Sequence, residues 1–287
     1  MCSFRLFGVQ KPKEEEVQKS KGKEVQNPNE EDVWSTEVTD DDWRNAVEDA
    51  FGVKYSKDWK ILLGAPTRLK GEYSIIEGVN VIADNAFSEC EHLTYIDIPD
   101  SVTCIGDRAF EYCYSLTNID IPDSITSIGD YTFKCCNSLT DINIPNSVTN
   151  IGSYAFWSCD SLTNINIPNS VTNIKEWTFA HCKSLTNVNI PNCVTTIGEA
   201  AFCRCTSLTS INIPNNVTTV EEGVFNGCKS LTCIYIPDSV TTIDSGAFGN
   251  CNNIPSKIKS DIIKRFGKEV FESWPLLIPS AESAKTH

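Results

Sequence analysis

The sequence predicts an α/β repeat solenoid, with parallel strands stacked on one side, short helical turns on the other, and a cap at each end. Two observations predict this fold. Four residue types recur every 23 positions without an insertion, and self-similarity at a fixed period indicates stacked repeats. Within each period, an alternating apolar pattern typical of a strand precedes a short helical pattern. The rows run from Phe87 to Phe248, Cys90 to Cys251, Leu93 to Leu231 and Pro99 to Pro237.

The first half of one unit has the pattern of a half-buried strand. Leu93, Ile96 and Ile98 are expected to point inward. Tyr95 and Asp97 alternate outward between them, as in a parallel sheet with one face in the core. The proline that follows has no backbone N–H and ends the strand.

The second half of the unit is expected to return as an extended piece followed by about one helical turn. Val102 and Ile105 point inward from the extended piece, and residues 107–113 form the turn that buries Phe110 and Cys113. Burial contributes ~1.5–3 kcal/mol per large side chain, which offsets backbone ordering only where neighbouring coils share their apolar surfaces. No single repeat should therefore fold alone.

The segments that flank the repeats have different patterns. Residues 1–38 are polar with few apolar anchors, which predicts disorder. Apolar residues at helical spacing from Trp43 to Phe51, after an acidic N-cap run, predict a helix, and apolar residues after Ser260 predict another. The predicted divisions are a disordered segment at 1–38, an N-terminal cap of a helix and a hairpin at 39–70, eight 23-residue repeats at 71–253, and a capping helix with a tail at 254–287.

Charge and hydropathy exclude several classes of protein. The formal net charge of −14 argues against a nucleic-acid partner, which needs a surplus of Lys and Arg, and indicates that a charged partner is basic. No apolar run approaches the ~20 residues that span a bilayer, so membrane insertion is not expected. The opening MCSFRLFGVQ does not have the pattern of a secretory signal, which favours a cytoplasmic, reducing location.

The repeat unit resembles a known family. The segment LTDINIPNSVTNIGSYAFWSC at 139–159 is similar to the leucine-rich repeats of the BspA-like family, of the type found in Bacteroides. The likeness covers about residues 71–253, and the lead-in YSKDWKILLGAP at 55–66 also resembles the segment that precedes such repeats. The resemblance implies a leucine-rich-repeat scaffold with a binding role and no catalytic residues. It also implies an alternative location at the cell surface or in secreted form, as an adhesin for host protein or glycan.

The cysteine row and the histidines are candidates for chemistry. Stacked Cα atoms ~4.8 Å apart lie within disulfide range, yet a row of identical inward residues beside Phe is typical of thiols that fill a core. The spacings do not match a zinc site, and we predict neither a metal nor a cofactor. His181, near acidic residues and Trp177, is interpreted as a surface residue and not a general base, so the chain is not expected to be an enzyme.

The outward strand positions form the first candidate binding surface. They make a polar groove that changes from Asp at one end to Asn in the middle and suits hydrogen bonding to a protein or glycan. The alternative is that the Asn side chains bond to one another and only solubilise the sheet. The candidate residues are Tyr95, Asp97, Asn118, Asp120, Asp141, Asn143, Asn164, Asn166, Asn187 and Asn189.

The second candidate surface is an aromatic patch on the side of the helical turns. Its residues vary from coil to coil and are expected to be largely exposed, as interface anchors are. The alternative is that Tyr131, Tyr154 and Trp177, which share one row, stack on each other between coils. The candidate residues are Tyr112, Tyr114, Tyr131, Tyr154, Trp157 and Trp177.

Together these patterns predict a non-enzymatic scaffold that binds a protein or peptide, with a glycan as a possible ligand. Two Thr rows also run along the repeats, from Thr94 to Thr232 and from Thr103 to Thr241. Regular Thr arrays can order water, so ice binding is a distant alternative, as is an enzyme. The simpler interpretation is that these β-branched residues favour strand and pack along the ladder.

Overall fold

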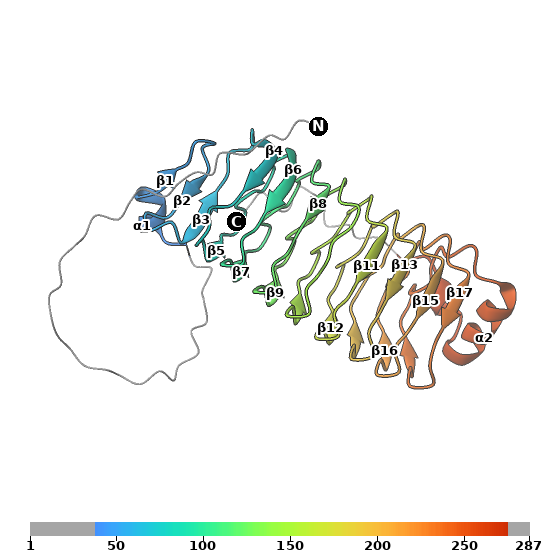
Figure 1. Ribbon diagram of the computed structural model, residues 1–287. Helices are drawn as coiled ribbons and strands as arrows, with labels where there is room; N and C mark the ends of the chain where they lie inside the picture. Colours follow the sequence, from blue (N-terminus) through green and yellow to red (C-terminus); the bar gives the residue numbers. More distant parts are fainter. Residues whose placement is uncertain (1–37, 275–287) are drawn as a thin grey trace, which may run out of the picture. The chain divides into compact units, whose positions relative to one another are not determined.

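A computed structural model describes residues 38–274 of the chain as a stack of parallel coils (Figure 1). The Phe row from Phe87 to Phe248 marks eight of them, all with fully buried rings. The predicted parallel-strand solenoid is therefore confirmed. The predicted disorder of residues 1–38 falls outside the described range except for Val38.

One row of strands lies along the face that we call the strand face. It consists of β4 (Lys70–Ser74), β6 (His92–Asp97), β8 (Asn118–Ile119), β11 (Asn164–Asn166), β13 (Asn187–Asn189), β15 (Ser210–Asn212) and β17 (Cys233–Tyr235). Pairing is parallel and joins positions 23 residues apart, as with Asn164 and Asn187, except at the start of β4, where a register shift makes the spacing 22. Because paired positions are one repeat apart, side chains of the same type lie beside each other in neighbouring coils.

A second row of strands forms where the sequence predicted an extended piece. It consists of β5 (Val81–Ile82), β7 (Cys104–Ile105), β9 (Ser127–Ile128), β10 (Asn150–Ile151), β12 (Asn173–Ile174), β14 (Thr196–Ile197), β16 (Thr219–Val220) and β18 (Thr242–Ile243). These strands pair in parallel from β5 to β10 and again from β12 to β18. Each coil therefore contributes to two sheets where both rows are formed.

The third side of the coils, here called the turn face, lies within residues 84–251 and consists of hydrogen-bonded turns. The prediction of a helical turn in each coil is therefore wrong. Phe87 donates its N–H to the Ala109 carbonyl of the next coil at 2.7 Å, while Cys90 donates to Phe87 within its own coil. Asn85 and Glu89 have positive φ, which a continuous helix does not allow. The backbone N–H groups are thus divided between turn closure and coil stacking.

The core is a ladder of stacked rings. Successive Phe rings from Phe87 to Phe248 are parallel or nearly so, with centroids 5.3–5.7 Å apart. Such aromatic pairs contribute roughly 0.5–1.5 kcal/mol beyond the burial of their surface. Each coil therefore depends on its neighbours for both burial and stacking.

The Cys and Thr rows complete the backbone hydrogen bonding between coils. The Cys113 thiol donates to the Phe87 carbonyl at 3.2 Å, and the pattern repeats through Cys251. In the same way, the Thr117 hydroxyl donates to the Thr94 carbonyl. Burial raises the pKa of the Cys90 thiol to about 12. The Cys row therefore consists of protonated thiols that hold adjacent coils together.

The N-terminal helix is shorter than predicted. α1 (Asp40–Arg44) is capped by Thr39, whose side chain forms a reciprocal capping box with Asp42. Asn45 then bonds back to the Asp41 carbonyl, and the chain leaves the helix. Short polar side chains compete with helix in this way. Phe51, assigned to the helix face by its spacing, is instead 52% exposed in the turn after β1.

A small antiparallel region joins α1 to the coils. β1 (Val47–Glu48) pairs with β2 (Lys54–Tyr55), and β2 pairs with β3 (Ile61–Gly64). β3 then pairs in parallel with β5, so its backbone continues into the second strand row.

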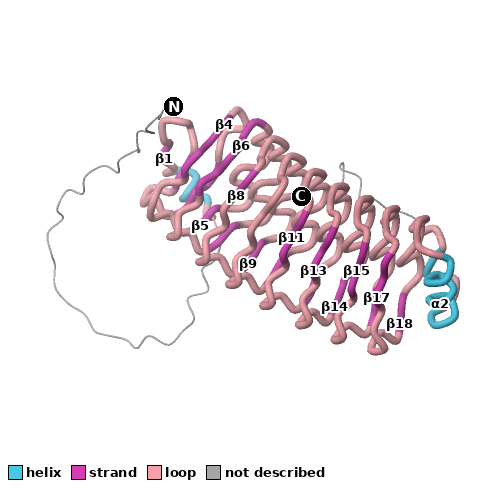
Figure 2. The backbone as a smooth tube through the Cα atoms, turned by 45° about the vertical axis from the view of Figure 1, so that its right-hand side comes forward, coloured by secondary structure: helices cyan, strands magenta, loops and turns pink. Residues whose placement is uncertain are grey.

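At the C-terminal end of the stack lies the helix α2, Ser256–Phe266 (Figure 2), followed by a short 3₁₀ helix. α2 begins earlier than the expected start after Ser260, and Val270 lies in the 3₁₀ helix, η1 (Glu269–Phe271). The Phe248 N–H donates to the Val270 carbonyl at 2.8 Å. The Phe271 ring lies 5.9 Å from Phe248 and continues the ring ladder. η1 thus takes the place of a further coil at this end.

Candidate binding surfaces

The candidate strand-face residues lie where the pattern placed them. Tyr95 is half-buried, and the others are exposed. Between them point the buried residues Ile96, Ile119, Ile142, Ile165 and Val188. The backbone thus holds a regular array of polar side chains toward solvent while the opposite side of each strand closes the core.

The candidate side chains of this face do not form a continuous ladder. The one hydrogen bond between two of them runs from the Tyr95 hydroxyl to Asp120 at 3.4 Å. Asn118 accepts from the next backbone N–H, Asp141 does the same, and Asn164 donates to the neighbouring Thr163 hydroxyl. Among the candidate residues between Tyr95 and Asn189, no hydrogen bond joins two Asn side chains. The solubilising Asn ladder considered above is therefore not what the structure has, and hydrogen-bonding capacity is left for a ligand.

A shallow groove runs across the middle of the strand face. Its volume is about 320 Å³, and its polar lining comes from Asp141, Asn143, Asn164, Asn166, Asn187 and Asn189. At the N-terminal end, Asp97, Asp120 and Asp141 are exposed, and no Lys or Arg among residues 38–274 forms an ion pair with them. The face is polar along its length and acidic at one end.

The aromatic patch is mostly packed and not largely exposed, which corrects the expectation. Tyr131, Tyr154 and Trp177 stack with ring centroids 4.7 and 5.8 Å apart. Trp177 is only 4% exposed, and among the six candidate aromatics only Tyr114, at 38%, is exposed. Inter-coil stacking, the alternative interpretation of this row, is therefore what the structure has.

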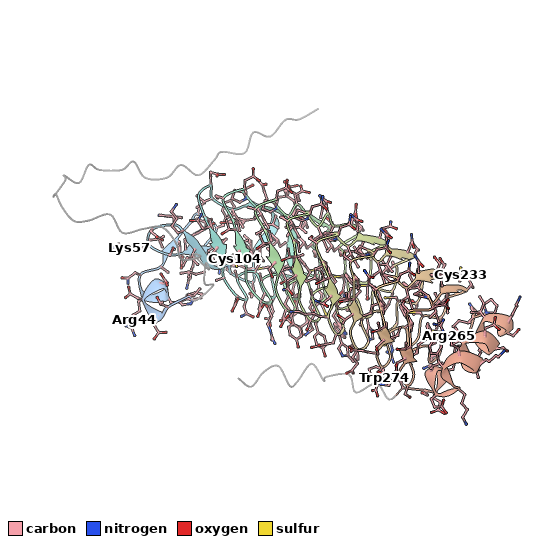
Figure 3. The ribbon with its side chains drawn as sticks, turned by 90° about the horizontal axis from the view of Figure 1, so that it is seen from below. Arg44, Lys57, Cys104, Cys233, Arg265 and Trp274 are labelled. Carbon is pink, nitrogen blue, oxygen red and sulfur yellow. The ribbon has the colours of Figure 1, made fainter. Side chains whose placement is uncertain are left out.

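Trp274 buries the end of the aromatic row. Its ring lies 5.6 Å from Trp177, over coils in which the row continues with Ala200, Gly223 and Gly246. A Cβ atom at Gly223 would lie 2.6 Å from the Trp274 ring, so only glycine leaves room for it. In Figure 3, Trp274 and Cys233 of the strand face lie on opposite sides of the stack. The change from aromatic to small residues along this row is visible in the sequence, but Trp274, which fills the space, lies far along the chain.

The remaining aromatic candidates surround a lysine. Lys134 lies 2.7 Å from the buried Glu111 and 3.1 Å from the Tyr112 hydroxyl. It also lies over the rings of Tyr112, Tyr131 and Trp157 at 4.9, 5.3 and 5.7 Å. Burial opposes its charge, but the bonds to Glu111 and Tyr112 raise the pKa of Lys134. These contacts tie the aromatics to the coils and leave little of them for a partner.

His181 lies on the turn face, where its ring packs 5.1 Å from Trp157. Its Nε2 atom is buried without a hydrogen-bond partner within residues 38–274. Burial, with Arg204 and Lys183 nearby, lowers the pKa of His181 to about 4. In the same range, no three His, Cys, Asp or Glu side chains gather as metal ligands would. The imidazole is therefore neutral near pH 7 and packs against Trp157.

Stacked 23-residue coils with a Leu row and an open strand face define a leucine-rich-repeat solenoid. A family model described as the BspA type leucine rich repeat region, in six copies, matches residues 70–186 and 177–278. These matches cover most of the chain, so the protein belongs to the BspA-type leucine-rich-repeat family. Repeat proteins of this kind are generally interaction scaffolds.

Solved structures of bacterial leucine-rich-repeat proteins are similar to this chain. One from T. pallidum is 27% identical, with a TM-score of 0.53, over 79% of this chain and 100% of that one. One from Eubacterium ventriosum is 26% identical, with a TM-score of 0.51, over 82% of this chain and 52% of that one. One from Bacteroides ovatus is 28% identical, with a TM-score of 0.44, over 73% and 70%. No curated protein matches significantly.

No helix within residues 38–274 is long and apolar enough to cross a membrane. The predicted cytoplasmic location, however, has no support from the family or from the similar structures.

Proposed function

We propose that the protein is a non-enzymatic scaffold that binds a protein or peptide on its strand face. The observation that carries this proposal is that the exposed Asn side chains of the strand face do not bond to one another. Each of these amides therefore keeps donor or acceptor capacity for a ligand in successive coils.

The chemistry of the partner follows from the charge of this face. Asp97, Asp120 and Asp141 are exposed and form no ion pair within residues 38–274, which favours Lys or Arg at the end of the partner that lies over the N-terminal coils. The amides around Asn166 can donate to and accept from a peptide backbone. A partner segment with a basic end and a polar, extended middle fits both regions.

The strand face supports the proposal better than the aromatic patch does. Interface anchors need exposed ring surface, and Trp177 is covered by Trp274. Tyr112, Tyr131 and Trp157 are already in contact with Lys134. Binding through the patch would require these contacts to break first.

The test is photo-crosslinking from two positions of the full chain in lysate of the native cells. A crosslinking amino acid at Asn166, on the strand face, should capture a discrete protein that is identified by mass spectrometry. The same amino acid at Asn173, exposed on the second strand row, is the matched control and should not capture it. Equal capture from both positions would contradict the proposal.

Charge variants then test whether the partner's basic residues lie over the N-terminal coils. The triple variant Asp97→Asn, Asp120→Asn, Asp141→Asn should weaken binding of the captured partner by about tenfold and reduce its dependence on salt. The control triple Asp100→Asn, Asp123→Asn, Asp238→Asn removes the same charge from exposed positions outside the strands of this face. If both triples weaken binding equally, the strand face has no special role.

A surface adhesin that binds host protein or glycan is the second candidate. Asn amides bond to sugar hydroxyls as readily as to peptide groups, so the same face favours it. Protease treatment of intact cells should then cleave the protein without lysis. An uncut protein, with a cytoplasmic marker as control, would remove this candidate.

A further inference from the structure

Two rows beside the buried cysteines change their charge along the turn face. At the N-terminal end these rows carry Glu89 and Glu91, and toward the C-terminal end the same positions carry Lys183, Arg204 and Lys229. A residue needed for stacking recurs in every coil, as the Phe row does. The reversal from acidic to basic therefore has a cause outside the stacking of coils.

The basic positions line a pocket of about 550 Å³. Its walls come from successive coils and include His181, Lys183, Arg204, Lys229, Asn250 and Asn252. The pocket is open in part because the row that contains Arg204 continues with Gly227. A Cβ atom at Gly227 would lie 3.1 Å from the Arg204 side chain.

The positive charge of this pocket is only partly neutralised. Lys183 pairs with Asp160 at 2.7 Å. Arg204 and Lys229 have no carboxylate within 4.0 Å among residues 38–274. Two cations that line one pocket without an ion pair are unusual for a chain with a net charge of −14. Like charges repel, so their proximity favours an anion between them.

Neutral hydrogen-bonding groups line the same pocket, and the Asn250 amide donates to Asn226 at 3.5 Å. Asn250 and Asn252 are exposed at the end of the stack. In earlier coils, the backbone N–H at the position of Asn250 donates to the next coil, as Gly227 does to the Gly249 carbonyl at 2.8 Å. The Asn250 N–H has no such acceptor within residues 38–274, because η1 replaces the next coil. An amide-rich rim therefore lies next to two unpaired cations.

We propose that this pocket binds an acidic saccharide, a sugar that carries a carboxylate or sulfate group. Arg204 and Lys229 would hold the anionic group, and the Asn side chains would bond to ring hydroxyls. The pocket offers a single arginine for bidentate contact and several amides, which suits a hydroxylated ligand better than a phosphopeptide. The proposal is independent of the strand face, which lies on another side of the coils.

The first experiment is calorimetric titration of the full chain with a sulfated, uronic-acid-containing disaccharide and with its neutral parent disaccharide. The acidic sugar should bind saturably and more weakly at high salt, and the neutral sugar should not bind. The double variant Arg204→Gln, Lys229→Gln should weaken binding on the order of tenfold or more. Gly227→Asn should also weaken it by filling the pocket, since Asn tolerates positive φ.

The matched control is Lys257→Gln, Lys264→Gln, which removes the same charge from exposed positions on α2. This control should bind the acidic disaccharide as the unmodified chain does. Loss of binding in the control, equal binding of the neutral sugar, or tighter binding of a phosphoserine peptide would each overturn the proposal.

A second measurement locates the ligand. The His181 imidazole lines the pocket, and its pKa of about 4 reflects burial and the nearby Arg204 and Lys183 charges. An anion bound between these groups favours the protonated ring, so the pKa of His181 should rise in NMR titrations with the acidic disaccharide. A His181 titration that does not move while the sugar is bound would place the ligand elsewhere and overturn the assignment.

Discussion

The strand face and the turn face share the 23-residue period, but residue types recur along the strand face and change along the turn face. On the strand face, the same few polar residue types recur and stay exposed, as Asn164 and Asn187 do. On the turn face, one row changes from Tyr154 to Trp177 to Gly223, and Trp274 lies over the gap. Repetition of buried residues, as in the Phe row, reflects what each coil needs from its neighbours. Repetition of exposed residues gives one uniform surface, and departures from repetition indicate contacts that occur once.

The largest effect should come from breaking the shared core. Phe156→Ala removes one ring from the middle of the Phe ladder and should lower the free energy of unfolding by about 3–5 kcal/mol. Denaturant titration followed by circular dichroism measures it. Asn166→Ala, on the strand face, is the control and should stay within about 0.5 kcal/mol of the unmodified chain. Comparable losses in both variants would show that the strand face also carries stability.

A smaller effect should come from the contact that occurs only once. Trp274→Ala uncovers Trp177 and the small residues beside it, and should lower the free energy of unfolding by about 2 kcal/mol. The loss is smaller than for Phe156→Ala because this terminal segment can open locally. The fluorescence of Trp177 should shift to longer wavelength as water reaches its ring. Trp274→Phe keeps a ring in place and should recover part of the loss. Unchanged stability and emission in Trp274→Ala would contradict the proposed packing.

The smallest effect should be a change in pH dependence at the basic pocket. The pKa of His181 is about 4 in the folded chain, against an ordinary value of 6.5, so only the unfolded chain binds its proton between these values. The contribution of His181 to the free energy of unfolding is therefore fully present above pH 6.5 and decreases as the pH falls toward 4.

His181→Asn tests this by removing the imidazole at a position of positive φ that Asn tolerates. The melting temperature of this variant should fall less between pH 6.5 and 4 than that of the unmodified chain. Comparing variants is necessary because burial raises the pKa of Asp107 and Glu199, which acts in the opposite direction. His92→Asn, at an exposed position, controls for loss of an imidazole. Parallel melting curves for all three proteins would contradict the assignment.

Much of the fold could be predicted because period and burial are local in a repeat protein. The spacing of Leu93, Ile96 and Ile98 was enough to orient the strand and expose its polar residues. The predicted helical turn was wrong because an apolar pattern of about one turn does not show where each N–H points. The predicted helix through Phe51 was wrong because Asn45 and Asp49 bond to the local backbone and end the helix early.

The candidate surfaces could be predicted only in part. The strand-face residues are exposed because exposure follows from alternation along one strand. The aromatic patch was misjudged because Trp177 is covered by Trp274, which lies beyond the repeats. The basic pocket was not anticipated, although Lys183, Arg204 and Lys229 were visible as breaks in periodic rows.

The sequence alone determined that identical coils stack, since rows of Phe, Cys and Leu at one spacing can bury their surface only against copies of themselves. It also determined which strand positions face solvent. Only the tertiary structure decided that the turn face is formed by hydrogen-bonded turns and that Trp274 covers the aromatic row. It also decided that Lys183, Arg204 and Lys229 line one pocket. The physical reason is that periodicity describes contacts between neighbouring coils, whereas these features depend on backbone direction and on residues that meet only after the chain has folded.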